Sequence, residues 1–154
     1  MPPVGLSHKI YCMKEQALAT RNEQLLATLE NSRNYTMGVA EAMPDKFYGF
    51  APTEGVWNFG ELLSHIAYGI QWWEANYIKG EKTDWAPPPA KNTKAAVVAY
   101  LENAYNGLEK TLNGKLSDEA IKGFHATTDH ITHHRGQAVL YLRCQGITPP
   151  EYVY

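Results

Sequence analysis

The sequence predicts an all-α protein, a four-helix bundle of the up-and-down type with one long connection. Apolar residues recur at intervals of three and four along four stretches, and no stretch shows the alternation of a half-buried strand. The run Pro87–Pro89 cannot continue a helix and indicates an extended connection between the second and third helices. A length of 154 residues suits one hydrophobic core, so a single domain is expected.

The first helix is expected over Gln16–Met43, which keeps a helical apolar period without an internal proline. Pro44 follows this stretch and ends the helix. We assign residues 1–15 to an N-terminal extension and residues 16–154 to the bundle domain.

The second helix has the best-marked start in the chain. Asn58 is a preferred capping residue, and Glu61 stands three positions later, which together predict a capping box. The helix is expected to continue to about Lys79, and Gly80 then ends it.

The third and fourth helices are bounded by similar signals. Asn92 or Thr93 is expected to cap the third helix, and Gly114 to close it. Ser117–Glu119 predicts a short helical turn, after which the last long helix is expected over Thr127–Gln145.

Charge and cysteine content indicate which classes of partner and which cellular compartment are expected. The formal net charge is −2 and the Lys and Arg residues are scattered, which argues against a nucleic-acid partner. Cys12 and Cys144 are two distant thiols that indicate neither a disulfide framework nor a cysteine zinc site, so the reducing cytoplasm is the expected compartment. The first residues lack the apolar run of a signal peptide or a spanning helix, and no membrane partner is expected.

Three histidines are the strongest functional signal. His130 and His134 are one turn apart on one face of the expected last helix, where two imidazoles can share a metal ion. His65, in the second helix, can supply a third ligand if the two helices pack side by side. Three neutral imidazoles without a fourth protein ligand leave coordination positions open, as in catalytic sites. His133 points about 100° away from His134 and should lie off the metal face.

Each histidine also has an interpretation without a metal. His65 lies among apolar residues, where a core histidine bonded to a backbone carbonyl is an equally good account. For His130 and His134, that account requires two buried imidazoles to find separate partners on one face, so metal binding is favoured. His8 and His125 are expected to be solvated and to have no role in the site.

Three residues near the histidines are candidates to line a pocket. Glu61 lies one turn before His65 and could accept its second ring proton, although a capping role accounts for this carboxylate equally well. Gln137 and Tyr141 lie one and two turns beyond His134, where they would line the mouth of a pocket or fill the bundle.

Two further residues of the last helix are assigned structural roles. Arg135 is expected to form a structural ion pair. Gly136 in mid-helix costs about 1 kcal/mol relative to alanine, which predicts a close approach of a neighbouring helix at this level.

Two parts of the sequence resemble the DinB/YfiT-like metalloenzyme family: Asn58–Ala67, and His130–Arg143 followed by Gly146–Pro150. The resemblance extends roughly from the first long helix to the carboxyl terminus, and the His-x-x-x-His-Arg-Gly-Gln string is its most specific part. It implies a four-helix bundle, often a homodimer, that holds a divalent metal ion with one histidine of the second helix and two of the last. Position by position, these ligands are His65, His130 and His134.

The resemblance also implies an activity on small molecules, because characterised relatives transfer thiol cofactors such as bacillithiol or isomerise substrates with mycothiol or glutathione. No side chain stands out as nucleophile or general base, so the expected catalytic group is a metal-bound water, in a hydrolase, or a bound thiolate, in a thiol S-transferase. Zinc or nickel is favoured, with iron and manganese also compatible, and a low-molecular-weight thiol would serve as cosubstrate. The alternatives are a binding or dimerisation module that the ion merely stabilises, and a vestigial site.

Overall fold

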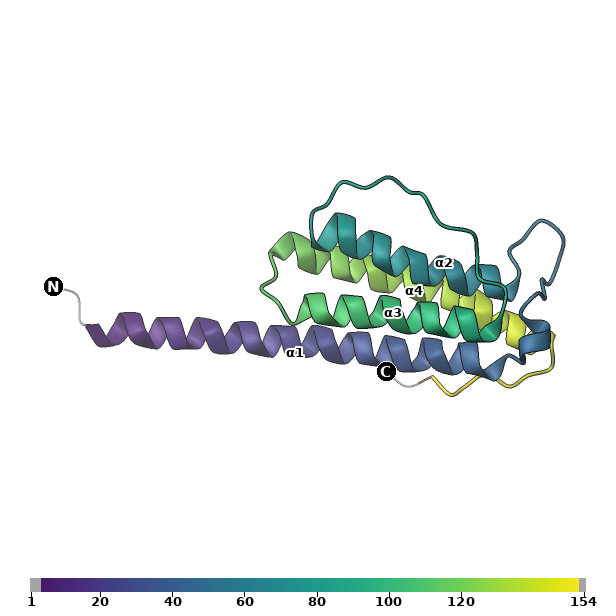
Figure 1. The fold of residues 1–154 in the computed structure, drawn as a ribbon. Coiled ribbons are helices and arrows are strands. Elements are labelled where there is room, and N and C mark those ends of the chain that lie inside the picture. Colours follow the sequence, from purple (N-terminus) through teal and green to yellow (C-terminus); the bar gives the residue numbers. More distant parts are fainter. Residues whose placement is uncertain (1–3, 153–154) are drawn as a thin grey trace.

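Four helices form a bundle, as predicted, in a computed structural model that describes residues 4–152 (Figure 1). Side chains are described for Met13, Gln16 and residues 20–152. Within this part of the chain there is no strand. The elements in chain order are α1 (Val4–Ala42), η1 (Asp45–Phe47), α2 (Phe59–Trp73), η2 (Glu74–Ile78), α3 (Lys94–Leu112) and α4 (Asp118–Cys144).

The long predicted connection runs from η2 to α3 and spans residues 79–93, passing along the outside of the bundle (Figure 1). Because of this crossover, α2 and α3 run in the same direction, whereas α1 and α4 run in the opposite one. α2 packs against both α3 and α4, and α1 packs against the same two helices. The histidines of α2 and α4 therefore belong to neighbouring helices.

Helix α1 begins at Val4, well before the expected start at Gln16, and its first part projects beyond the other helices (Figure 1). No proline interrupts residues 4–42, so the helix can propagate outward from its packed part. Its end at Ala42, just before Pro44, confirms the predicted stop. The division into residues 1–15 and 16–154 stays a prediction, and the side chains of His8 and Cys12 lie outside the described ones.

The predicted capping box opens α2. Asn58 Oδ1 accepts a hydrogen bond of 2.9 Å from the backbone N–H of Glu61, and Glu61 Oε2 accepts one of 2.8 Å from the backbone N–H of Asn58. At the other end the helix widens into the π-helical turn η2, which reaches Ile78, close to the predicted end. Gly80 follows with a φ of 75°, a conformation that favours glycine.

Side-chain caps begin α3 and α4. Thr93, and not Asn92, caps α3 by accepting from the N–H of Ala96. Ser117 caps α4, which is one continuous helix, so the prediction of a separate turn followed by a helix from Thr127 is wrong. Gly123 has low helix propensity, but it packs directly on the backbone of η2, and this tertiary contact outweighs the local preference.

The hydrophobic core lies between the four helices and also takes residues from the loop after α1. No helix in the described part of the chain is both long and apolar enough to cross a bilayer. The largest fully buried apolar and aromatic side chains are Tyr48, Tyr105, Phe59, Phe124, Met43, Leu62, Leu63, Ile66, Ile70, Leu101, Leu108 and Leu112.

Two structural predictions for α4 require correction. Arg135 is only 5% exposed but has no carboxylate partner among the described residues. Its Nη1 instead donates to the carbonyl and hydroxyl of Ser32 and to the hydroxyl of Thr36, both in α1. Gly136 is exposed, and an added Cβ there would meet no atom within 4 Å, so no helix approaches it. The closely packed glycines are Gly69 and Gly123.

Candidate metal centre

The structure brings the three predicted histidines together in the seam between α2 and α4. The Nε2 atom of His65 lies 3.0 Å from Nε2 of His130 and 3.1 Å from Nε2 of His134. All three side chains are half-buried, and their ligand nitrogens lie within 4.8 Å of one another. The three rings thus direct the same nitrogen toward a common point.

Burial sets the protonation state of this cluster. It lowers the pKa of His65 to about 4, with a smaller contribution from His134 in the same direction. The pKa of His130 is also lowered to about 4, first by burial and then by the neighbouring histidines. Burial lowers the pKa of His134 as well, although a hydrogen bond with Gln137 opposes this effect. The imidazoles are therefore neutral at pH 7, which is the state that binds metal ions.

Protein groups alone cannot satisfy the three converging nitrogens. Gln137 Oε1 lies 2.9 Å from Nδ1 of His134 and can only accept, so the ring proton is on Nδ1 and Nε2 presents a lone pair. His65 Nε2 can carry only one proton, so it can donate a hydrogen bond to only one of its two close neighbours, the Nε2 atoms of His130 and His134. A divalent cation would satisfy all three nitrogens, and the separations of 3.0 and 3.1 Å from His65 Nε2 to the other two suit ligands about 2.1 Å from a shared ion. The donor set therefore fits a divalent metal ion.

Gly69 of α2 makes room for the ring of His130. A Cβ built at Gly69 would overlap the His130 ring, coming to 2.8 Å from Nδ1 and closer still to Cε1. That Nδ1 is buried and has no hydrogen-bond partner among the described residues. Packing against a bare backbone, rather than a hydrogen bond, therefore holds His130 in place. The sequence analysis missed this role, for which the only signal was a glycine one turn after His65.

Aromatic rings from two loops border the cluster. The ring of Trp57, just before α2, lies 4.5 Å from that of His65 at an interplanar angle of 34°. Trp85, in the connector, lies 5.5 Å from the His65 ring. These tryptophans are 48% and 44% exposed, and the sequence analysis assigned neither of them to the site. The Tyr141 hydroxyl donates to the carbonyl of Trp57 at 2.9 Å and so holds this loop near the cluster.

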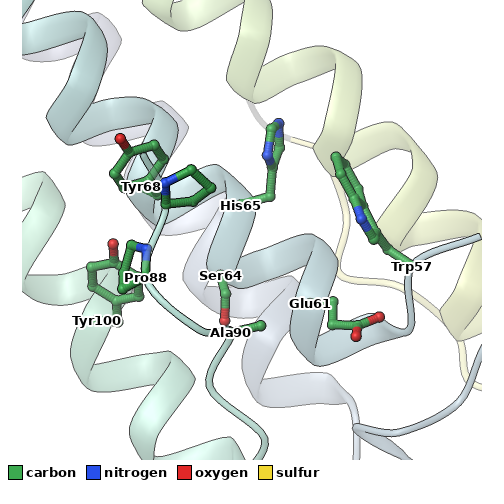
Figure 2. A pocket seen from close by; sticks show the side chains of 9 residues that line it. Trp57, Glu61, Ser64, His65, Tyr68, Pro88, Ala90 and Tyr100 are labelled. Atoms are coloured by element: carbon green, nitrogen blue, oxygen red, sulfur yellow. The ribbon is translucent and has the colours of Figure 1, made fainter. Parts of the chain in front are cut away.

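A pocket of about 180 Å³ opens beside His65 (Figure 2). Glu61 lines it, as expected, but this carboxylate caps α2 and has no recorded hydrogen bond to His65 among the described contacts. The other two candidates, Gln137 and Tyr141, are not among the lining residues. Gln137 hydrogen-bonds to His134, and Tyr141 hydrogen-bonds to the Trp57 carbonyl.

The remaining histidines of α4 lie apart from the convergent nitrogens. His133 and His125 are exposed, and neither belongs to the three-nitrogen cluster. Helical spacing predicted this for His133, whereas His125 was expected to be solvated and lies within α4. Cys144, at the end of α4, is a free, exposed thiol.

The sequence matches the family model of the DinB superfamily over residues 28–138, which is well over half of the chain. The chain belongs to the DinB superfamily. Membership in the DinB superfamily and the three-histidine cluster together fit a metal-binding protein. The matched region contains all three of these histidines, together with Gln137.

The DinB fold is also seen in a solved structure. A DinB-like protein from Bacillus cereus ATCC 10987 superposes with a TM-score of 0.67 over 86% of this chain and 97% of its own, at 17% sequence identity. This likeness confirms the helical bundle of the chain. No curated protein matches the sequence.

Proposed function

We propose that this DinB-superfamily protein is a divalent-metal-dependent enzyme that acts on a small molecule, as a thiol S-transferase or a hydrolase. One observation carries the proposal: three neutral imidazole nitrogens converge, and one of these histidines, His65, also lines a pocket that is open to a ligand. Structural metal sites are closed by four protein ligands, whereas three ligands beside a pocket leave room for substrate or water.

In this proposal, the residues around the site have different roles. His65, His130 and His134 hold the ion, and Gln137 keeps the His134 ring in the tautomer that exposes its Nε2 lone pair. Trp57 and Trp85 flank His65 and exclude part of the solvent from it. A divalent ion held by these histidines would supply Lewis-acid chemistry, either by acidifying a water ligand for hydrolysis or by coordinating a substrate thiolate for thiol transfer.

Metal content is the first test. Untagged full-length protein, incubated with zinc, nickel, iron or manganese and then dialysed, should retain close to one ion per chain by mass spectrometry. His65→Ala and His134→Ala should both lose it. His133→Ala is the matched control, because His133 neighbours the cluster but lies outside it. A wild-type chain that binds none of the four ions would end the proposal.

A second experiment separates an enzyme from a metal-stabilised module. The metal-loaded protein is assayed for conjugation of a low-molecular-weight thiol to an electrophilic acceptor, and for hydrolysis of small esters and amides. Turnover that is lost in a folded His134→Ala variant supports the enzyme. Absence of both activities, combined with an ion that chelators remove only after unfolding, supports the module. A homodimer and a cytoplasmic location remain predictions, which sedimentation and cell fractionation would check.

A further inference from the structure

The pocket beside His65 is walled mainly by rings (Figure 2). Trp57 forms one side, Tyr68 and Tyr100 form another, and the connector contributes Pro87 and Pro88. Flat aromatic and proline surfaces stack well against a planar ring and offer few partners to a flexible polar chain. The shape of the wall therefore selects for a planar apolar group.

Hydrogen bonds hold this wall in position without any ligand. The backbone N–H of Ala86 donates to the Tyr68 hydroxyl at 2.8 Å, and that of Lys91 donates to Ser64 Oγ at 3.0 Å. These two bonds fasten the connector to α2 on both sides of its proline run. A wall that is already ordered loses little entropy when a ligand enters, which favours binding of a rigid group.

The size of the pocket limits what it can hold. Its volume of about 180 Å³ is slightly larger than the roughly 150 Å³ apolar cavity that accommodates benzene in another protein. This volume accommodates one six-membered ring with a small substituent.

Charge limits the ligand further. Glu61 is the only carboxylate or cationic side chain among the lining residues, apart from the neutral His65. Its Oε2 is engaged by the backbone of Asn58, and its Oε1 has no hydrogen bond to any described residue. Lys91 of the connector is not a lining residue, and its Nζ lies 5.7 Å from the centre of the Tyr100 ring. A carboxylate at the rim disfavours an anionic substituent and favours a neutral donor or a cation.

We infer that this pocket binds the acceptor substrate of the enzyme through a single aromatic ring that carries a neutral or cationic substituent. The reacting group of that substrate then lies beside His65, at the edge of the three-histidine cluster. The inference rests on the proposed function in so far as it calls this ligand a substrate. Binding of the ring to the pocket does not itself require a metal.

Matched probes test the inference directly. Benzyl alcohol, benzylamine and phenylacetate share one ring and differ in charge, and 1-hexanol is the non-aromatic control. Ligand-observed NMR titrations use the full chain as purified and after treatment with EDTA. Benzylamine and phenylacetate are compared only in the metal-free sample, because an amine or a carboxylate can bind a metal. We expect benzyl alcohol to bind with a Kd of about 1 mM. Benzylamine should bind roughly tenfold more tightly and phenylacetate roughly tenfold more weakly.

Two pairs of variants locate the binding. Ala90→Phe fills the pocket from the exposed connector and should abolish binding of benzyl alcohol, whereas Lys82→Phe, at an exposed position of the same connector away from the lining, should not. Glu61→Gln keeps the capping geometry, since glutamine also serves in a capping box. This variant should remove the difference between benzylamine and phenylacetate.

Each result bears on one claim only. Equal binding of 1-hexanol and benzyl alcohol, or unchanged binding in a folded Ala90→Phe variant, would overturn the aromatic pocket even if the metal is present. Charge discrimination that survives Glu61→Gln would overturn the role of this carboxylate. Specific ring binding by a chain that retains no metal would preserve the pocket and end the proposed enzyme instead.

Discussion

Two clusters of polar side chains are buried between helices of this protein, and their hydrogen bonding differs. Between α1 and α4, Arg135 donates to Ser32 and Thr36, while its guanidinium lies 4.9 Å from the ring centre of Tyr35. Tyr105 of α3 completes this cluster by donating to Thr36 at 2.9 Å. Nη1 of Arg135 and the Tyr105 hydroxyl thus find acceptors within the protein.

The histidine cluster between α2 and α4 lacks such partners. Three Nε2 atoms converge on one another, and the Nδ1 of His130 is buried without a partner among the described residues. A buried cluster whose polar groups have hydrogen-bond partners stabilises helix packing. Buried polar groups without partners are energetically unfavourable, and a ligand that binds them removes this penalty. The arginine cluster therefore serves helix packing, whereas the histidine cluster fits a metal ion, although both include residues of α4.

The largest expected effect follows from truncating the satisfied cluster. Arg135→Ala removes three hydrogen bonds of a buried charged group and its packing on Tyr35, so we expect the free energy of unfolding to fall by about 3 kcal/mol. Metal stoichiometry should be unchanged in the folded fraction. Urea denaturation followed by circular dichroism measures the first quantity, and mass spectrometry the second. A loss of metal from stable Arg135→Ala protein would mean that the two clusters are not independent.

A pair of glycine substitutions tests the packing of the histidine cluster. Gly69→Ala places a methyl group against the His130 ring and should weaken zinc binding about 100-fold, because the ring must move. Gly136→Ala, in an open and exposed position, should leave zinc affinity unchanged and raise stability by up to about 1 kcal/mol. Competition with a chromophoric chelator gives both affinities. Equal affinities in the two variants would show that Gly69 does not shape the site.

Gln137→Ala should have a smaller effect on the same site. Its amide oxygen fixes the tautomer of His134, and loss of such an orienting partner typically costs about tenfold in metal affinity. Gln137→Glu preserves an acceptor at this position and should retain the affinity or increase it. The same chelator competition applies, and an alanine variant with unaltered affinity would remove Gln137 from the site.

The smallest expected effect concerns pH. The folded-state pKa values of His65 and His130 are lowered by burial to about 4, below the value of 6.5 for an exposed histidine. The unfolded chain therefore binds more protons between these values, so stability of the metal-free protein is highest above pH 6.5 and falls as the pH drops toward 4. His65→Ala should flatten this dependence between pH 6.5 and 5, whereas the exposed His133→Ala should not. Thermal denaturation across this range provides the comparison.

Local signals accounted for the helix ends that side chains cap. Asn58 and Glu61 formed the predicted box, because a capping box is a short-range arrangement within one turn. The predicted start of α4 was wrong because a long-range contact, and not a short-range one, decides it. Residues near Gly123 favour a break when considered alone, but their contact with η2 keeps the helix continuous, and that contact joins segments far apart in sequence.

For the site, the spacing of His130 and His134 was sufficient to predict that their nitrogens share a face, because helix geometry repeats every 3.6 residues. The partners of the neighbouring residues could not be predicted in this way. Arg135 lies one position from His134 yet faces α1 and bonds hydroxyls instead of a carboxylate. Gly136 was expected to be the close-packed glycine, but that role belongs to Gly69 on the other helix.

Periodicity and contacts within a few residues were enough to predict the helical class, the capped start of α2, and the shared face of His130 and His134 on α4. Only the tertiary structure decided that His65 reaches the pair on α4, that Gly69 admits the His130 ring, and that Trp57 and the connector enclose a pocket. Those features depend on the register and direction of helices joined by a crossover, where packing between distant segments outweighs local preference.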